Sequence, residues 1–141
     1  MSSAVGVERV PTLDPALLFH CDFGFGASGA YPFDSAFAVP RPARLLAVAR
    51  VDGRIAGYIA CTPDGDAAEV RRLEIDRSCR GQGLGRRLLD DARAWASEQG
   101  LFALRLETLA DNPDAGNFFS RYGFTLIREC EALHWHLPLA R

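Results

Sequence analysis

A glycine-rich segment of the chain has residue types and spacing that suit the binding of a diphosphate. A diphosphate needs several donors converging on its oxygens, and the backbone N–H groups at a helix N-terminus supply them with a favourable dipole. Glycines let the backbone approach the anion closely and adopt torsion angles that other residues avoid. The segment consists of Arg80, Gly81, Gln82, Gly83, Leu84 and Gly85. Two further arginines follow it directly, so we expect an anion site here.

Two common glycine-loop motifs do not fit this segment. A dinucleotide-binding fold has G-x-G-x-x-G near the start of a parallel βαβ unit, whereas the glycines here fall as G-x-G-x-G. A phosphate-binding P-loop ends in G-K-[ST], which the chain lacks. On local spacing alone, an ordinary glycine-rich turn remains open.

The elements that must position this segment are clear from residue 44 onward. Apolar periodicity predicts the order strand, strand, strand, helix, strand, helix, strand, strand. The expected strands are 45–51, 54–61, 67–76, 101–108, 124–129 and 132–137, and the expected helices are 84–99 and 114–122. Asp52-Gly53 predicts a tight hairpin turn. Strict alternation along 67–76 would put Val70, Arg72 and Glu74 on one face and Glu69, Arg71, Leu73 and Ile75 on the other.

The first part of the chain gives weaker signals. Residues 7–10 are a candidate first strand, and Asp14-Pro15 suits the start of a short helix. Residues 22–43 are rich in Gly, Pro, Phe and Ala, which predicts a loop with little regular structure. Its phenylalanines either line a pocket for a small amine with an apolar part or fill the core.

Two motifs at a fixed separation resemble those of one enzyme family. L-E-I-D-R-S-C-R-G-Q-G-L-G over 73–85 resembles the central motif of the Gcn5-related N-acetyltransferases (GNAT), R/Q-x-x-G-x-G/A after a strand. N-x-x-A-x-x-F-F-x-x-x-G-F over 112–124 resembles the family's second signature, N-x-x-A-x-x-L-Y-x-x-x-G-F. The resemblance covers about residues 44–137.

This resemblance implies a fold and a cosubstrate. The fold would be a single α/β (α+β) domain over residues 1–141, with a mixed, mostly antiparallel, splayed sheet flanked by helices. Acetyl-CoA would be the cosubstrate and would lie in the gap of the sheet. Backbone groups of Leu73 and Ile75 would bind its pantetheine arm, amides across Arg80 to Gly85 its pyrophosphate, and Asn112 the pantetheine region.

The implied activity is transfer of an acetyl group to a primary amine of a small-molecule or peptide acceptor, by direct attack. Glu69 would be the general base, with Glu107 and Glu74 as rivals. The alternative for each carboxylate is a solvated strand charge paired with an arginine.

The position of the family's tyrosine acid is occupied by Phe119, and Tyr122 lies one helical turn later. Tyr122 either reaches the departing thiolate or packs before Gly123. The loss of the usual acid favours a second hypothesis, a catalytically weak or inactive acetyl-CoA-binding sensor on the same fold.

Other polar residues are less informative. His134 and His136 share a face of the last expected strand, without a third ligand that would indicate a metal site. Cys79 precedes the loop and is more simply a small loop residue than an acyl carrier.

Composition limits the remaining classes of partner and location. The net charge of −2 argues against nucleic acid as a partner. No apolar stretch approaches the ~20 residues that span a membrane. Four cysteines without a C-x-x-C pair, and no recognisable signal peptide, favour a cytoplasmic protein. Leu133, Trp135 and Leu137 on one face of the last strand are the basis for expecting a homodimer.

Overall fold

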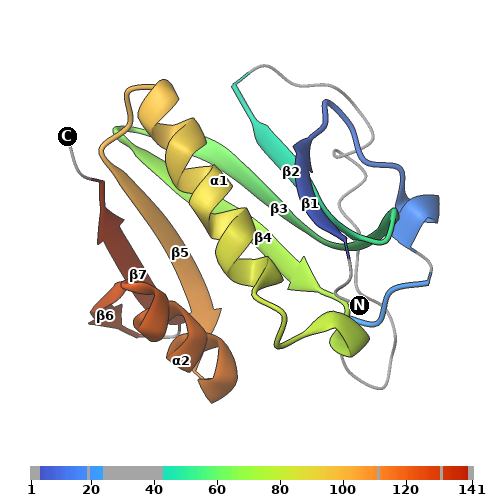
Figure 1. The fold of residues 1–141 in the computed structure, drawn as a ribbon. Coiled ribbons are helices and arrows are strands. Elements are labelled where there is room, and N and C mark those ends of the chain that lie inside the picture. Colours follow the sequence, from blue (N-terminus) through green and yellow to red (C-terminus); the bar gives the residue numbers. More distant parts are fainter. Residues whose placement is uncertain (1–3, 19, 24–42, 111, 131, 140–141) are drawn as a thin grey trace.

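A mixed seven-stranded sheet forms the centre of the computed structural model, which describes residues 4–18, 20–23, 43–110, 112–130 and 132–139. The strand order in this part of the chain is β1-β2-β3-β4-β5-β7-β6. The strands are β1 (Val5–Arg9), β2 (Leu45–Val51), β3 (Arg54–Asp64), β4 (Ala67–Ile75), β5 (Ala103–Leu109), β6 (Thr125–Glu129) and β7 (Ala132–Pro138). The helices are α1 (Leu84–Glu98) and α2 (Pro113–Tyr122), with short 3-10 turns η1 (Pro15–Leu18) and η3 (Arg77–Cys79). The expected fold class and element order are therefore confirmed (Figure 1).

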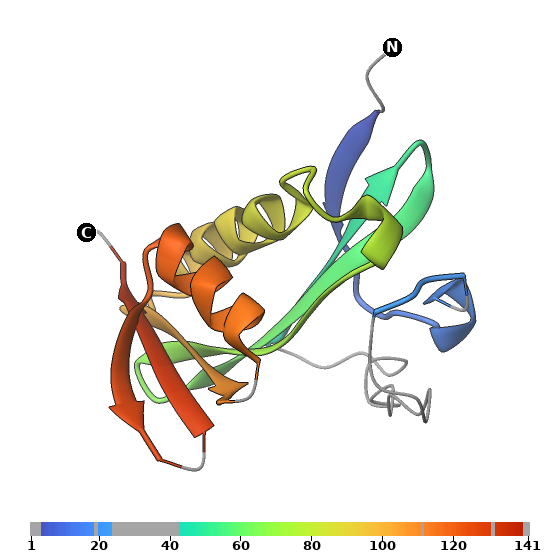
Figure 2. The same ribbon diagram turned by 90° about the horizontal axis from the view of Figure 1, so that it is seen from below.

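Helix α1 packs its apolar face against the sheet, as its sequence periodicity predicts. Its buried residues are Leu84, Leu88, Leu89, Ala92, Trp95 and Ala96. They join a core cluster that includes side chains of β2, β3, β4 and β5 and Phe119 of α2. A smaller cluster on the other face packs Leu13 and Leu18 against Tyr58. Both α-helices thus lie on one face of the sheet, and η1 lies on the other (Figure 2).

Strands β4 and β5 are joined over a short distance only. They run parallel, and their register covers Ala67↔Ala103, Ala68↔Leu104 and Glu69↔Arg105. Beyond Glu69 the two strands diverge toward their C-terminal ends (Figure 1). Every other neighbouring pair in the sheet is antiparallel. The splayed, mostly antiparallel sheet is the arrangement expected from the sequence.

The strict alternation expected along β4 is wrong. The register with β3 shifts between Ala60 and Cys61, because Cys61 pairs with Val70 whereas Ala60 pairs with Arg72. Arg71 is therefore an extra residue, and a bulge of this kind reverses the parity of the side chains that follow it. Val70 and Leu73 both pack into the core beside α1. Glu69 consequently shares its face with Arg72 and Glu74, not with Leu73 and Ile75.

One face of β7 is covered within the chain itself. Trp135 is buried, and its Nε1–H donates a hydrogen bond of 2.9 Å to Oγ1 of Thr108. Leu133 and Leu137 pack against the same core. The face on which the homodimer was predicted thus packs against the monomer's own core, with Trp135 buried and Leu133 and Leu137 partly buried. In the described residues no helix is both long and apolar enough to cross a membrane.

Candidate functional site

The glycine-rich loop connects β4 to α1, and Asp76 holds its start. The Asp76 carboxylate is buried and accepts hydrogen bonds from the N–H of Asp22 at 3.1 Å and the hydroxyl of Ser78 at 3.1 Å. Burial alone would raise the pKa of Asp76, but these hydrogen bonds outweigh it and leave the pKa below its ordinary value. The charged carboxylate therefore fixes the end of β4 and brings residue 22 beside it.

Gly81 and Gly83 leave the outer side of the loop open. Their φ angles are +83° and +78°, in the left-handed region that glycine adopts at no steric cost. A Cβ at either position would meet no heavy atom within 4 Å. Gly83 is the N-cap of α1, and neither a capping side chain nor an acidic residue in the first turn competes for the helix amides. These features fit a diphosphate at the helix N-terminus.

Arg80 has a different role from its neighbours. Its Nε donates to the carbonyl of Ile75 at 3.3 Å, and its Nη2 donates to the carbonyl of Phe23 at 3.0 Å. Its backbone N–H is directed at the carbonyl of Arg77 at 3.4 Å. Arg80 thus braces the loop against the end of β4, and the positive charge beside the open amides comes from the exposed Arg86 and Arg87.

The packing of α2 against α1 explains why position 85 is a glycine. A Cβ at Gly85 would lie 2.9 Å from the Phe118 ring, closer than real Cβ contacts allow. The glycine therefore lets α2 approach the first turn of α1. Sequence reasoning assigned Gly85 to the cosubstrate, and the structure supplies this second reason for its presence.

The remaining expected contact residues are two on β4 and one at the start of α2. Leu73 and Ile75 pair with Ile59 and Gly57 of β3, and their β5-facing side lies beyond the paired segment. Asn112 is the N-cap of α2, and its side-chain oxygen accepts from the N–H of Ala115 at 3.3 Å. Leu73 and Ile75 thus lie on the unpaired part of β4, and Asn112 has a capping role in α2.

Tyr122 belongs to the contact between the two helices. Its hydroxyl donates a hydrogen bond of 2.7 Å to Asp90 of α1, and the Arg86 and Arg93 guanidinium carbons lie 5.5 and 5.9 Å from its ring centroid. Burial, followed by the hydrogen bond to Asp90, raises the pKa of Tyr122 to about 12. Phe119 is buried in the core. The packing interpretation of Tyr122 is the one that these contacts support.

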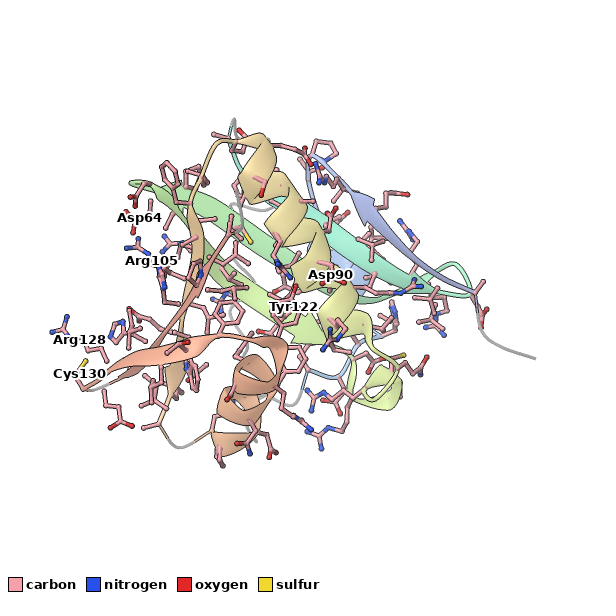
Figure 3. The ribbon with its side chains drawn as sticks, turned by 60° about the vertical axis from the view of Figure 1, so that its left-hand side comes forward. Asp64, Asp90, Arg105, Tyr122, Arg128 and Cys130 are labelled. Atoms are coloured by element: carbon pink, nitrogen blue, oxygen red, sulfur yellow. The ribbon has the colours of Figure 1, made fainter. Side chains whose placement is uncertain are left out.

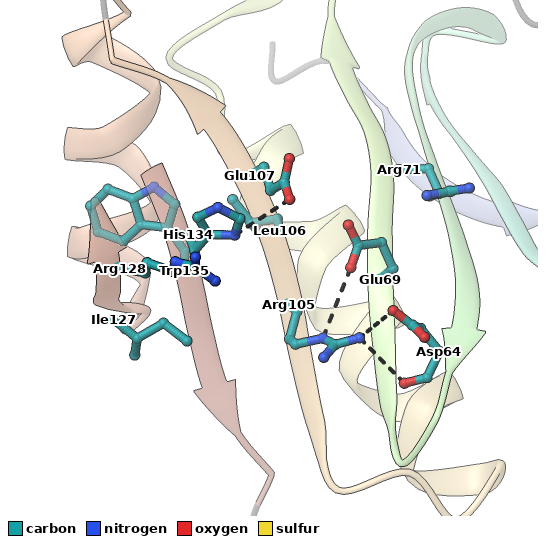
Figure 4. A pocket seen from close by; sticks show the side chains of 10 residues that line it. All are labelled: Asp64, Glu69, Arg71, Arg105, Leu106, Glu107, Ile127, Arg128, His134 and Trp135. Atoms are coloured by element: carbon teal, nitrogen blue, oxygen red, sulfur yellow. Dashed lines mark hydrogen bonds and ion pairs between the residues drawn. The ribbon is translucent and has the colours of Figure 1, made fainter. Parts of the chain in front are cut away.

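A pocket of about 310 Å³ lies where β4 and β5 are still paired (Figure 4). Its lining residues are Asp64, Glu69, Arg71, Arg105, Leu106, Glu107, Ile127, Arg128, His134 and Trp135. Glu69 and Arg105 are partners in the sheet register, and Glu107 pairs with His134 across β5 and β7. The charged side chains of these strands thus meet on the face turned away from α1.

Glu69 is half-buried in this pocket beside a shared arginine. Its Oε2 lies 3.9 Å from Nε of Arg105, whose Nη2 is ion-paired with Asp64. Burial raises the pKa of Glu69, aided by Glu107 and Asp64, while Arg105 and Arg71 act in the opposite direction without cancelling the rise. Such a carboxylate is more basic than one in water.

The rival residues lie in different places. Glu107 Oε1 is 3.3 Å from Nδ1 of His134, and both line the pocket. Glu74 pairs with Tyr58, on the far side of the bulge. His136 pairs with Arg105 in the register but does not line the pocket. In the described residues, no three His, Cys, Asp or Glu side chains are grouped as metal ligands would be.

Sequence reasoning missed Asp64 and Arg105. Asp64 lies between the expected strands 54–61 and 67–76, and its contact with Arg105 joins residues 41 positions apart. The strand A-L-R-L-E-T-L does carry a usable signal, because Arg105 and Glu107 alternate with apolar residues and must share one face.

Comparison with known proteins agrees with this geometry. The model of the acetyltransferase (GNAT) family matches residues 15–124. The streptothricin acetyltransferase of Escherichia coli is 32% identical over 77 residues, which cover 54% of this chain and 44% of that protein. The chain spans less than half the length of the curated relatives it matches.

Solved structures show the same fold. The ribosomal-protein-S18-alanine N-acetyltransferase of Escherichia coli superposes with a TM-score of 0.78 at 21% identity, covering 98% of this chain and 96% of that one. The PaiA N-acetyltransferase of Thermoplasma acidophilum, in complex with coenzyme A, gives a TM-score of 0.64 at 21% identity, covering 67% and 60%. With the family match over most of its length, the chain belongs to the acetyltransferase (GNAT) family.

Proposed function

We propose that the protein is an N-acetyltransferase that moves an acetyl group from acetyl-CoA to a primary amine by direct attack. The observation that carries this proposal is the splay of β4 and β5, with open helix amides at one end and a half-buried glutamate at the other. Family membership supports acetyl-CoA as the cosubstrate.

The cosubstrate would follow the gap in the sheet. Its pyrophosphate would lie against the amides of the Gly81–Gly85 segment, near Arg86 and Arg87, where the α1 dipole favours an anion. Its pantetheine arm would run beside Leu73 and Ile75, whose β5-facing backbone lies beyond the paired segment. The thioester would then lie where the strands converge, close to the pocket that contains Glu69.

Glu69 would remove the proton of the attacking amine, directly or through one water. Its raised pKa makes the carboxylate a stronger base than an exposed glutamate. The neutral amine attacks the thioester carbonyl, and the CoA thiolate departs. A thiolate is a good leaving group, so a protonated tyrosine at position 119 is not required.

The acceptor would be a small-molecule or peptide amine. The pocket carries the carboxylates of Asp64, Glu69 and Glu107, which attract a protonated amine. Its arginines repel a cation, so the amine would bind beside a carboxylate and away from the guanidinium groups. The streptothricin and S18-alanine relatives support a small molecule and a peptide terminus respectively. Residues 24–42, including most of the phenylalanines considered for the acceptor pocket, lie outside the described part of the chain.

The second candidate function is a non-catalytic acetyl-CoA sensor, favoured by Phe119 in place of the family's tyrosine. Both candidates bind acetyl-CoA, so turnover separates them. We expect free CoA to be released when the protein is mixed with acetyl-CoA and a panel that contains streptothricin-like amines, polyamines and peptides with free N-termini. Binding by calorimetry without release for any amine would favour the sensor, and absence of binding would contradict both.

Two further properties belong to the proposal. Reduced cysteines are compatible with a cytoplasmic location, since all four are free thiols. The homodimer stays a prediction, and the face of β7 on which it was based is largely covered by the monomer's own core. The outer strand β6 carries Ile127 with 58% of its surface exposed, which makes this edge the better candidate. Light scattering at micromolar protein measures the mass, and a monomer contradicts the prediction.

A further inference from the structure

Cys130, His134 and Glu107 form a row at the edge of the pocket. Cys130 Sγ lies 3.5 Å from Nε2 of His134, and Nδ1 of the same imidazole lies 3.3 Å from Oε1 of Glu107. This is the order of nucleophile, base and orienting group that activates a side chain for covalent acyl transfer. In direct transfer through Glu69, none of the three accepts or donates the transferred proton.

The sheet fixes this row. Glu107 and His134 are directly opposite in the register of β5 and β7, so their side chains lie on the same face. Cys130 lies between β6 and β7, and its N–H donates to the carbonyl of Ala132 at 3.1 Å. Figure 3 labels the thiol near Arg128 of β6, and Figure 4 shows the contact between Glu107 and His134 within the pocket.

The contacts favour one tautomer of His134. A carboxylate accepts only, so the Glu107 contact favours the proton on Nδ1. The Cys130 thiol has two neighbours, the carbonyl of Ala132 at 3.6 Å, to which it donates, and Nε2 of His134 at 3.5 Å. The lone pair of Nε2 takes the proton when the S–H turns from the carbonyl to the imidazole. The thiol is exposed and His134 is partly exposed, so a small acyl donor can reach both.

Cys21 also has a histidine neighbour, but that histidine cannot act as a base. Its Sγ also lies 3.5 Å from an imidazole nitrogen, Nε2 of His20. That nitrogen is 2.7 Å from the carbonyl of Ile55, so it carries a proton and cannot act as a base. Burial raises the pKa of Cys21 to about 11. A neighbouring histidine alone therefore does not make a nucleophile, and Cys21 is an internal control.

We propose that Cys130 is a reversible S-acylation site that accepts the acetyl group of acetyl-CoA. This rests on the proposed function, because acetyl-CoA is the donor. His134 takes the thiol proton, and Sγ attacks the thioester carbonyl. A new C–S bond forms to Cys130 as the bond to the CoA sulfur breaks, and the CoA thiolate recovers the proton from His134. No oxidant or reductant is needed.

The exchange has a consequence for regulation. One thioester is replaced by another, so little free energy separates reactants from products. The acetylated fraction of Cys130 then follows the ratio of acetyl-CoA to free CoA. The thioester would stand at the edge of the pocket, where it would alter access for the acceptor.

The experiment uses the full chain with acetyl-CoA and no amine. Mass spectrometry should find one acetyl group on the peptide that contains Cys130, none on Cys21, and loss of the group with neutral hydroxylamine or excess CoA. His134→Gln should slow the reaction at least ~10-fold, as expected for loss of a general base. Glu107→Gln should slow it less, because the imidazole remains. Cys130→Ser should abolish the adduct.

Two results overturn the inference. One is acetyl-CoA binding by calorimetry without acetylation of Cys130. The other is acetylation of Cys130 at the same rate in His134→Gln. If acetyl-CoA does not bind, the proposed function fails, and p-nitrophenyl acetate then tests the thiol by itself. A burst of p-nitrophenol that depends on Cys130 and His134 supports the nucleophile, whereas no burst contradicts it.

Discussion

The hydroxyl of Tyr122 donates a hydrogen bond of 2.7 Å to Asp90 and thereby joins α2 to α1. Helix α1 follows the C-terminal end of β4 and α2 follows that of β5 (Figure 1). The contact between Tyr122 and Asp90, both labelled in Figure 3, therefore helps to set the position of α2 beside the proposed cosubstrate site. Its raised pKa, about 12, keeps the hydroxyl protonated and donating throughout the neutral range.

Tyr122→Phe should therefore reduce stability more than chemistry. Loss of one hydrogen bond to a charged group should lower the free energy of unfolding by about 1–2 kcal/mol, measured by urea denaturation. A cycle with Asp90→Ala tests the pair, since the double variant should be destabilised by less than the sum of the two single ones. A large loss of turnover in Tyr122→Phe with unchanged stability would instead identify Tyr122 as the acid.

Gly83→Asp should weaken acetyl-CoA binding at least ~10-fold, because it adds a carboxylate beside the pyrophosphate and a strained φ at the N-cap. Calorimetry measures the affinity. Gly53→Asp is the matched control: Gly53 has a φ of +84° and open space around its Cβ, but lies in the β2–β3 turn. Equal affinity in the two folded variants would remove the loop from the site.

Glu69→Gln keeps the shape of the side chain and removes its basicity. The turnover number at pH 7 should fall at least ~30-fold, because a general base typically contributes about 10²–10⁴-fold. The acetyl-CoA affinity should be nearly unchanged. Higher pH should restore part of the rate, because more acceptor arrives as free amine. Asp64→Asn, which removes another carboxylate beside Arg105, should lower the turnover number by a smaller factor.

The rival bases are tested in the same assay. If Glu69→Gln keeps full turnover and Glu107→Gln or His136→Gln does not, the base is that residue. If all three keep turnover, the amine loses its proton to solvent and the protein supplies orientation alone.

The same substitution makes a separate prediction about stability. The pKa of Glu69 is raised in the folded protein, so its ionised form is less favourable there than in the unfolded chain. The stability contributed by the protonated form is present below the unfolded pKa and is lost as pH rises through the folded pKa. Glu69→Gln mimics the protonated form, so its Tm should exceed that of the native protein at pH 7 and approach it at low pH. Thermal unfolding at pH 7 and pH 4 measures the difference, and a gap that widens toward low pH contradicts the assignment.

Local signals were sufficient for most of the fold. The face of α1 from Leu84 to Ala96 follows helical spacing, and Asp52-Gly53 forms the expected turn, because both depend on neighbours in sequence. The bulge at Arg71 was missed because its register depends on pairing with Ala60 and Cys61. The contact between Asp64 and Arg105 depends on β4 and β5 lying side by side, which sequence spacing does not give.

The short parallel seam between β4 and β5 affects how the molecule resists unfolding. The seam divides the sheet into one half with β1, β2, β3 and β4 and another with β5, β7 and β6. The two halves share three register pairs, so the core under α1 supplies most of the contact between them. Beyond the seam, β4 presents an inner edge whose backbone groups face the gap. A molecule that occupied this edge would stabilise the native state in proportion to the logarithm of its concentration. Amide hydrogen exchange along the C-terminal half of β4 would then slow with ligand more than exchange in β2, which is paired on both sides.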